Sequence, residues 1–409
     1  MERHLRADLP AGPRPDLSAA AHRGGGRHFP GPPPLGLYVH LPWCVRKCPY
    51  CDFNSHAARG PLPERAYARA LLADLETQLD GPAAGRPLCS VFIGGGTPSL
   101  FSGEAVSLLL DGIRQRCVLE AGAEVTLEAN PGTLDAGHFE GYLRAGVNRL
   151  SIGVQSLSAD HLTALGRIHG PRQALDTYRT ARQVGFDNVN LDLMYGLPRQ
   201  STAQAAEDLE RLLALAPEHI SYYQLTLEPN TAFERAPPPV PVHDVLCDME
   251  EQGLSMLAAA GYDRYEVSAF ARPDRRCRHN LNYWRFGDYL GIGAGAHGKV
   301  TDAASATVER RAAPRHPTAY LERPGAAGSR RLLDDDDLVL EYMLNVLRLV
   351  GGVESALLER HTGLPLARIE PVLARCREDG LMLRGADWIG PTALGLRFLN
   401  DLLARFEGA

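Results

Sequence analysis

Strand-like and helix-like hydrophobic patterns alternate along the chain from Leu35 to about residue 225. Short runs rich in β-branched and aromatic residues occur at 36–40, 91–94, 124–128, 148–154, 188–194 and 219–225. Stretches with apolar residues at helical spacing separate them, near 64–80, 103–116, 135–145, 171–184 and 202–215. Because helix-length connections join parallel strands, the pattern predicts an α/β fold built from six βα units.

Six units favour an incomplete (β/α)6 barrel over a closed barrel of eight strands, and a doubly wound sheet is the alternative. In both folds, ligands bind beyond the carboxyl ends of the parallel strands. We therefore expect functional side chains just after each strand.

The segments outside this alternation predict the domain organisation. The start of the chain is rich in Pro, Gly, Arg and Ala, and 236–242 reads as a stiff proline-rich linker. Residues 301–331 are expected to form a loop, and helical periodicity returns after 332. The predicted parts are a disordered N-terminal extension (1–34), the barrel core (35–235), a linker and barrel-capping segment (236–331) and a mostly helical, winged-helix-like domain (332–409).

Composition and charge narrow the class of protein. The 409 residues carry a formal net charge of −6, and 332–409 holds 13 acidic against 8 basic residues, a net charge of −5. This balance argues against binding of nucleic acid, which favours basic surfaces. No run of about 18 apolar residues occurs, so we expect no transmembrane helix. A cytoplasmic location is expected for a different reason, because the cysteine cluster described below needs a reducing compartment.

Three of the eight cysteines lie within eight residues, in the spacing C-x3-C-x2-C. Cys44, Cys48 and Cys51 follow the first predicted strand, where a loop can wrap three thiolates around one face of an iron–sulfur cluster. Three protein ligands would leave one iron of a [4Fe–4S] cube open to a small chelating molecule. The alternatives are a Cys3His zinc site that includes His40, or ordinary buried cysteines.

Polar and glycine-rich strings follow the later strands. Gly94-Gly95-Gly96-Thr97-Pro98 follows the second strand, and three glycines allow backbone groups to approach a ligand closely. Glu128, Gln155 and Asp192 lie at or near the ends of the third, fourth and fifth strands, and Arg167 could hold a carboxylate bidentately. Simpler explanations exist for individual strings. The glycine string could form a tight turn, Glu128 could be a surface cap, and Asp192 could take part in a structural salt bridge.

Together these strings resemble the coproporphyrinogen III dehydrogenase-like branch of the radical S-adenosylmethionine (SAM) superfamily. The resemblance runs from about Leu37 to Lys299, and we expect it to continue through the C-terminal domain. It implies that Cys44, Cys48 and Cys51 ligate a [4Fe–4S] cluster. The residues implied for the SAM pocket are Tyr38, Tyr50, Gly95, Gly96, Thr97, Glu128, Gln155, Arg167 and Asp192, with Gln224 as a looser assignment.

One departure distinguishes two branches of that family. Phe53 stands where the catalytic dehydrogenases carry a further cysteine, and Cys51-Asp52-Phe53-Asn54 instead resembles the HemW-type haem-chaperone branch. A second string, HNxxYW, supports this resemblance and contains the residues implied for haem contact: His279, Asn280, Tyr283 and Trp284. A neutral imidazole can ligate haem iron, and aromatic rings can pack on a porphyrin.

Other interpretations of these residues remain open. The HNxxYW side chains could be buried and purely structural. Cys277 could be an alternative haem ligand, and His297 could be structural or line the same cavity.

The resemblance therefore implies a carrier whose cargo is haem. The expected partners are haem-acceptor apoproteins of the respiratory chain, reached by transient contact with the cytoplasmic face of the membrane. The alternative function is oxidative decarboxylation of coproporphyrinogen III, which Phe53 disfavours. A radical SAM protein that acts on tRNA or DNA is a third hypothesis.

Overall fold

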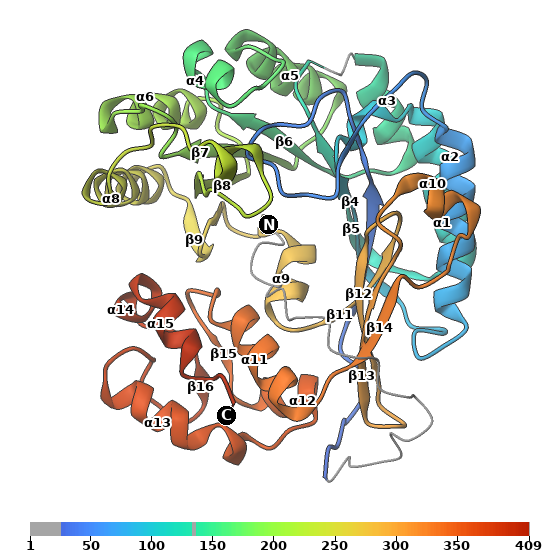
Figure 1. The fold of residues 1–409 in the computed structure, drawn as a ribbon, viewed down its shortest axis with the longest axis vertical. Coiled ribbons are helices and arrows are strands. Elements are labelled where there is room, and N and C mark those ends of the chain that lie inside the picture. The colour runs from blue at the N-terminus through green and yellow to red at the C-terminus, as the bar shows by residue number, and fades with distance from the viewer. Residues whose placement is uncertain (1–25, 133–135, 409) are drawn as a thin grey trace.

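The computed structural model describes residues 26–132 and 136–408, and its centre is a sheet of parallel strands (Figure 1). The six central strands lie side by side in the order in which they occur along the chain, and each neighbouring pair is parallel. A doubly wound sheet would reverse this order, so the prediction of an incomplete (β/α)6 barrel is confirmed. These strands are β1 (Leu35–Leu41), β4 (Leu88–Gly95), β5 (Leu119–Ala129), β6 (Arg149–Gln155), β7 (Val189–Tyr195) and β8 (His219–Gln224).

Helices cover the outer face of this sheet (Figure 1). Outward side chains such as Leu37, Val91 and Leu127 are fully buried against them and form the main hydrophobic core. The inward side chains of the same strands are often polar, because alternate residues of a strand face opposite sides. The outer helices are α1 (Glu64–Leu79), α2 (Gly103–Arg116), α3 (Ala136–Ala145), α4 (Ala159–Ala164), α5 (Pro171–Val184), α6 (Thr202–Leu213) and α8 (His243–Ala259).

Short strands extend both edges of the sheet. On one edge β11 (Asp288–Ile292) runs parallel to β1 and is followed by antiparallel β12 (His297–Asp302), β13 (Thr307–Ala312) and β14 (Ser329–Leu332). On the other edge lie β10 (Ala269–Ala271) and β9 (Asp263–Glu266). The predicted loop at 301–331 is therefore wrong, since this segment holds the end of β12, β13, α10 (Pro317–Glu322) and most of β14. Charged residues alternate in these edge strands and obscure their hydrophobic pattern.

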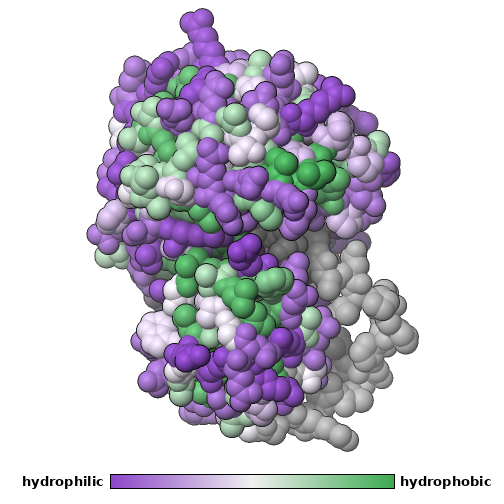
Figure 2. Space-filling model, turned by 90° about the vertical axis from the view of Figure 1, so that its left-hand side faces the viewer, coloured by the Kyte–Doolittle hydropathy of each residue, from purple (hydrophilic) through white to green (hydrophobic). Residues whose placement is uncertain are grey.

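The C-terminal residues form a second hydrophobic core below the open side of the barrel (Figure 1). A two-stranded sheet pairs β15 with β16, and helices surround it. On the face shown in Figure 2, apolar side chains gather on this lower part of the molecule. The division into domains stays a prediction. The elements are α11 (Asp335–Val346), β15 (Val353–Glu354), α12 (Ala356–Thr362), α13 (Glu370–Glu378), β16 (Trp388–Ile389), α14 (Ala393–Arg397) and α15 (Leu399–Ala404).

Part of the predicted disordered extension packs against the C-terminal core. The ring of Phe29 is buried in that core, and the His28 backbone N–H donates to the Gly363 carbonyl at 3.1 Å. The Arg27 guanidinium pairs with Asp335. The prediction of disorder is therefore wrong for residues 27–34, while residues 1–25 lie outside the described part of the chain. Among the described residues, no helix is both long and apolar enough to cross a membrane.

Candidate functional site

The three clustered cysteines lie in the loop that follows β1. Cys44 is in the short strand β2 (Trp43–Cys44), which pairs with β3 (His56–Ala57) and so fixes both ends of the loop. Within the loop, the Cys51 N–H donates to the Cys48 carbonyl at 3.1 Å. All three side chains are free thiols, with Cys44 buried and the other two half-buried. The first βα loop thus presents three sulfur donors at the carboxyl end of the sheet.

Burial and mutual repulsion oppose ionisation of these thiols. Burial raises the pKa of Cys44, although a hydrogen bond with Thr97 works against it, and the neighbouring thiols raise it further. Burial also raises the pKa of Cys51, partly offset by backbone and Ser55 hydrogen bonds and by the Lys47 cation. Three thiolates gathered here therefore need positive charge, which a cluster of iron ions together with nearby cations would provide.

The zinc alternative does not fit the geometry around His40. Its Nδ1 is 2.9 Å from the Tyr38 hydroxyl, and its Nε2 is 2.9 Å from the Asn54 carbonyl oxygen. Both ring nitrogens are therefore engaged. Across residues 26–132 and 136–408, no three His, Cys, Asp or Glu side chains are grouped as they would be around a single metal ion. Iron–sulfur clusters are held by cysteine thiolates, so the three thiols of the loop suit a cluster without any contribution from His40.

The glycine string after β4 is docked directly onto the cysteine loop. The Gly96 N–H donates to the Leu41 carbonyl at 2.8 Å, and the Thr97 N–H donates to the Trp43 carbonyl at 2.7 Å. A Cβ on Gly96 would lie 2.5 Å from the Trp43 carbonyl oxygen, and Gly95 has φ +120°. These two positions therefore require glycine, both for close approach and for the left-handed backbone.

Glu128 continues this arrangement on the next strand. Its carboxylate accepts the Gly95 N–H at 3.1 Å, so the end of β5 holds the glycine string from the other side. The loop after β1, the string after β4 and the end of β5 are thereby joined at one edge of the sheet.

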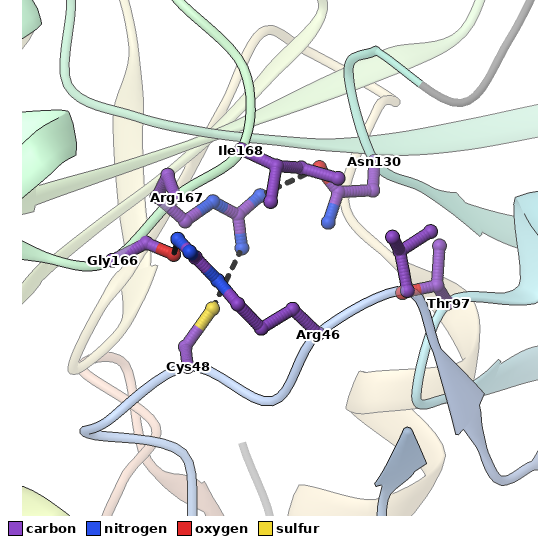
Figure 3. A pocket seen from close by; sticks show the side chains of 8 residues that line it. Arg46, Cys48, Thr97, Asn130, Gly166, Arg167 and Ile168 are labelled. Carbon is purple, nitrogen blue, oxygen red and sulfur yellow. Dashed lines mark hydrogen bonds between the residues drawn. The ribbon is translucent and has the colours of Figure 1, made fainter. Parts of the chain in front are cut away.

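A cavity opens between the cysteine loop and the loop after α4 (Figure 3). Arg167 reaches across it: one guanidinium nitrogen lies 3.9 Å from the Cys48 sulfur, and another donates to Asn130 Oδ1 and to the Gly153 carbonyl, both at 2.9 Å. In the opposite direction, the Arg46 guanidinium donates to the Gly166 carbonyl. The lining residues are Val45, Arg46, Cys48, Thr97, Asn130, Gly166, Arg167 and Ile168.

This cavity contains residues that the sequence analysis did not select. Asn130 directly follows β5 and is two residues after Glu128. Arg46 lies within the cysteine loop, between Cys44 and Cys48. The sequence signal that could have found Asn130 is its place directly after a strand, as for the other polar residues.

Several residues predicted for the SAM pocket lie around the cavity without lining it. Tyr50 is buried beside Arg167, which lowers its pKa but does not overcome the rise caused by burial. Tyr38 points inward from β1 and stacks on Phe92, with ring centroids 6.3 Å apart. Gln155, at the end of β6, has φ +66° and accepts the Tyr223 hydroxyl at 2.8 Å. A left-handed backbone is strained for a glutamine, which is common at functional positions.

Asp192 and Gln224 are less closely connected with this cavity. Asp192 accepts from Asn190 at 2.8 Å in a polar network on the inner face of the sheet, where burial raises its pKa. Gln224 is exposed at the end of β8 and packs near Gly196. The structure thus brings only some of the residues predicted for the SAM pocket together around this cavity.

The HNxxYW string forms α9 (Arg278–Trp284), which lies on the inner side of the sheet, between it and the C-terminal helices (Figure 1). His279 is 3% exposed, stacks on Phe92 with ring centroids 5.1 Å apart, and its Nδ1 is 2.9 Å from the Ser90 hydroxyl. Burial, aided by the Arg149 cation, lowers the pKa of His279 to about 3. Its Nε2 is buried and has no hydrogen-bond partner among the described residues. Asn280 and Trp284 are buried with it, and Tyr283 is half-buried.

Two neighbouring residues are poor candidates for a haem ligand. The Cys277 thiol donates to Glu124 at 3.3 Å, and burial raises its pKa to about 12, so it stays protonated near neutral pH. His297 is exposed at the start of β12. His279 is the more suitable ligand of the three.

Comparison with known proteins shows the family to which the chain belongs. The Radical SAM superfamily matches residues 38–212. The heme chaperone HemW of Escherichia coli (strain K12) is 49% identical over 374 residues, which cover 91% of this chain and 98% of the relative. The chain belongs to the HemW branch of the radical SAM superfamily. The HemW protein of Haemophilus influenzae is 45% identical over 381 residues, covering 92% of this chain and 99% of that protein.

A solved structure supports the same fold. The coproporphyrinogen III oxidase HemN of Escherichia coli, a radical SAM enzyme, superposes with a TM-score of 0.76 at 24% identity, covering 92% of this chain and 90% of that chain. Membership of the superfamily implies a [4Fe–4S] cluster and SAM as cofactors. In this HemW-branch chain Phe53 offers no sulfur, so the loop has three cysteines rather than four.

Proposed function

We propose that this protein is a haem chaperone, which binds haem and passes it to haem-requiring proteins. The proposal depends on one observation above all: His279 holds a neutral imidazole with an unbonded, buried Nε2, in a chain similar along nine tenths of its length to a protein named as a heme chaperone. A neutral imidazole nitrogen is a common axial ligand of haem iron. The buried aromatic rings around it favour an apolar, planar cargo.

The other HNxxYW residues would surround the cargo. The ring of Tyr283 lies 5.3 Å from that of His279, and Trp284 follows it on the same helix, so both could pack against a porphyrin face. Asn280 would supply a polar contact. Because His279, Asn280 and Trp284 are buried in the structure, haem binding requires that α9 move away from the sheet.

The cofactors would lie at the opposite, carboxyl end of the strands. Cys44, Cys48 and Cys51 would hold the [4Fe–4S] cluster, and Thr97, Asn130 and Arg167 line the adjoining cavity in which SAM would bind. Tyr38, Tyr50, Gly95, Gly96, Glu128, Gln155, Asp192 and Gln224 complete the proposed SAM set. When bound, the cluster supplies an open iron for a small chelating molecule. The cation of Arg167 could then orient a carboxylate.

Delivery of haem to respiratory apoproteins in the cytoplasm, with transient contact with the membrane face, is the remaining part of the proposal. The acidic C-terminal domain disfavours nucleic acid as a partner. If the C-terminal domain contacts the apoprotein, the barrel remains free to hold the cofactors. The division of the chain at 34, 235 and 331 is part of the same proposal.

The test is an anaerobic haem titration of cluster-reconstituted protein, followed at the Soret band. We expect saturation near one haem per chain, and weaker binding with a changed spectrum in His279→Ala. A matched control is His219→Ala, since His219 is equally buried but has both ring nitrogens hydrogen-bonded, to Asn190 and Tyr265. This control should retain haem binding.

Two results would contradict the proposal. Absence of saturable haem binding by the folded, reconstituted protein would reject the chaperone function, and turnover of coproporphyrinogen III with SAM would then support the alternative enzyme. Equal loss of binding in both variants would reject His279 as the specific ligand.

A further inference from the structure

Glu124 of β5 holds the start of α9 from inside the barrel. Its carboxylate accepts the backbone N–H groups of Arg278 at 3.1 Å and His279 at 3.2 Å, as well as the Cys277 thiol at 3.3 Å. Glu124 is 6% exposed, and its nearest cation is Arg149, 3.9 Å away and 2% exposed. A charged acceptor in so buried a place makes strong hydrogen bonds, because water does not compete for the donors.

The other end of α9 is held by the C-terminal helices. The guanidinium of Arg348 lies 4.5 Å from the ring centroid of Trp284, and the ring of His361 is 2.7 Å from the Arg285 carbonyl oxygen. Phe286 packs edge-on against Tyr342 of α11, with ring centroids 5.8 Å apart. The helix is therefore clamped between the inner face of the sheet and the second hydrophobic core.

The backbone directly after α9 is strained, at Phe286, while the exposed turn before it holds an aspartate in the same backbone region. Asp274 has φ +61° and Phe286 has φ +58°. The left-handed region is unfavourable for residues with a Cβ, above all for a bulky ring, and it persists where surrounding contacts enforce it. Release of those contacts would let Phe286 relax, so it is suited to act as a hinge.

We infer that α9 is a strap that keeps His279 closed, and that the Glu124 carboxylate is the latch that holds it. This rests on the proposed function, in which His279 ligates haem, since the closed strap leaves the imidazole 3% exposed and out of reach of a porphyrin. Release of the latch exposes the ring. The C-terminal domain closes the other end of the strap, so a partner that displaces this domain promotes opening.

Glu124→Gln tests the latch, because glutamine keeps the shape and one acceptor oxygen but removes the charge. We expect hydrogen–deuterium exchange of the amides in 277–285 to become about tenfold faster, the factor that one charge-assisted hydrogen bond supplies. The rate of haem association should rise by a similar factor, with the stoichiometry unchanged. Exchange in the outer helices of the barrel should stay the same.

Glu120→Gln is the matched control. Glu120 lies on the same strand and also pairs with α9, through the Arg278 side chain at 3.6 Å, but this pair is about half exposed. It should alter neither exchange nor haem association, since exposed ion pairs contribute little. If the buried Arg149 charge destabilises Glu124→Gln, the double variant Glu124→Gln/Arg149→Met removes that charge and carries the same expectation.

The possible outcomes test the strap and the haem-chaperone function separately. Unchanged exchange in 277–285 of a folded latch variant overturns the strap, whatever the protein binds. Faster exchange without faster haem association overturns its role in access to His279. Wild-type protein that binds no haem rejects the proposed function, while the exchange measurement still decides whether Glu124 holds the helix.

Discussion

Arg167 and Cys48 lie 3.9 Å apart, guanidinium nitrogen to sulfur, although 119 residues separate them in the chain. The contact is reciprocated, because Arg46 of the cysteine loop binds the carbonyl of Gly166, the residue before Arg167. Two arginines thus tie the cysteine loop to the loop after α4, one from each side (Figure 3). Arg167 is in turn fixed by Asn130 and Gly153, so its position relative to the sulfur is set by two neighbouring strands.

This geometry predicts that Arg167 affects the reduction potential of the [4Fe–4S] cluster that Cys48 is proposed to bind. A donor to a ligating sulfur stabilises the more negative, reduced state, so Arg167→Gln should lower the reduction potential of the reconstituted cluster. A contribution of about 1 kcal/mol corresponds to about 40 mV for one electron. The measurement is a redox titration followed by electron paramagnetic resonance.

Arg46→Gln serves as the control for that experiment. Arg46 carries the same charge near the same loop but binds a carbonyl rather than a sulfur, so its loss should change the potential less. Equal shifts in the two variants would show that only the overall charge matters, and no shift in Arg167→Gln would contradict the role of the contact.

Gly96→Ala should disrupt the proposed cluster site. The added Cβ would lie 2.5 Å from the Trp43 carbonyl oxygen, and both partners are backbone, so neither can move aside without breaking the contacts between the two loops. We expect a loss of about 1–3 kcal/mol in the free energy of unfolding and less than full iron content after reconstitution. Gly81→Ala is the control, since its nearest neighbour is 4.0 Å away. Full iron content in Gly96→Ala would contradict this prediction.

The sequence was most informative where local spacing decides the chemistry. The positions of Cys44, Cys48 and Cys51 and of the glycine string are set within a few residues of a strand end, so their meeting at one edge of the sheet could be predicted. Asn130 was not assigned because its partner Arg167 is 37 residues away, and only the folded chain brings them together. The spacing of HNxxYW likewise gives no sign that its helix packs between the inner face of the sheet and the C-terminal helices.

Tertiary contacts also explain the errors in the predicted elements. Phe29 is surrounded in sequence by Pro and Gly, which favour disorder, yet it finds a buried place beside Gly363, whose α carbon has no side chain to block it. The hairpin of β12 and β13 carries Lys299, Glu309 and Arg310 where a strand pattern would show apolar residues. Ion pairs replace hydrophobic burial there, and hydrophobic periodicity does not detect them.

Acid should destabilise the protein partly through His279. Its pKa is about 3 in the folded state against 6.5 for an ordinary histidine, so the unfolded chain takes up a proton first as the pH falls. The stability contributed by the neutral, buried ring is therefore complete above pH 6.5 and is lost progressively toward pH 3. The midpoint temperature of thermal unfolding of the apoprotein should fall as the pH is lowered from 7.5 to 5. In His279→Asn this decrease should be smaller.

The control for that pH series is His297→Asn. His297 is exposed at the start of β12, so its removal should leave the slope of the midpoint against pH unchanged. A His279→Asn variant whose slope matches that of the wild type would contradict the assignment of acid sensitivity to the buried ring.

The pair of Asp288 and Lys299 should be the costliest ion pair to break. Both side chains are at most 1% exposed, and they meet at 2.9 Å on neighbouring strands beside the strap. Burial alone would raise the pKa of Asp288, but Lys299 and Arg86 outweigh it and hold that pKa below its usual value. Lys299→Met leaves a buried carboxylate with less compensation, so we expect a loss of about 3 kcal/mol in chemical denaturation at neutral pH.

This loss should itself depend on pH. Because the folded pKa of Asp288 lies below the ordinary 3.8, the pair stabilises the protein at higher pH and ceases to do so as the carboxylate is protonated. The difference in the free energy of unfolding between the wild type and Lys299→Met should therefore become smaller in acid. Arg330→Met is the matched control: Arg330 pairs with Glu309 at 2.8 Å but is 66% exposed, so its loss should cost under about 1 kcal/mol. Equal costs for the two variants would show that burial does not strengthen the Asp288 pair.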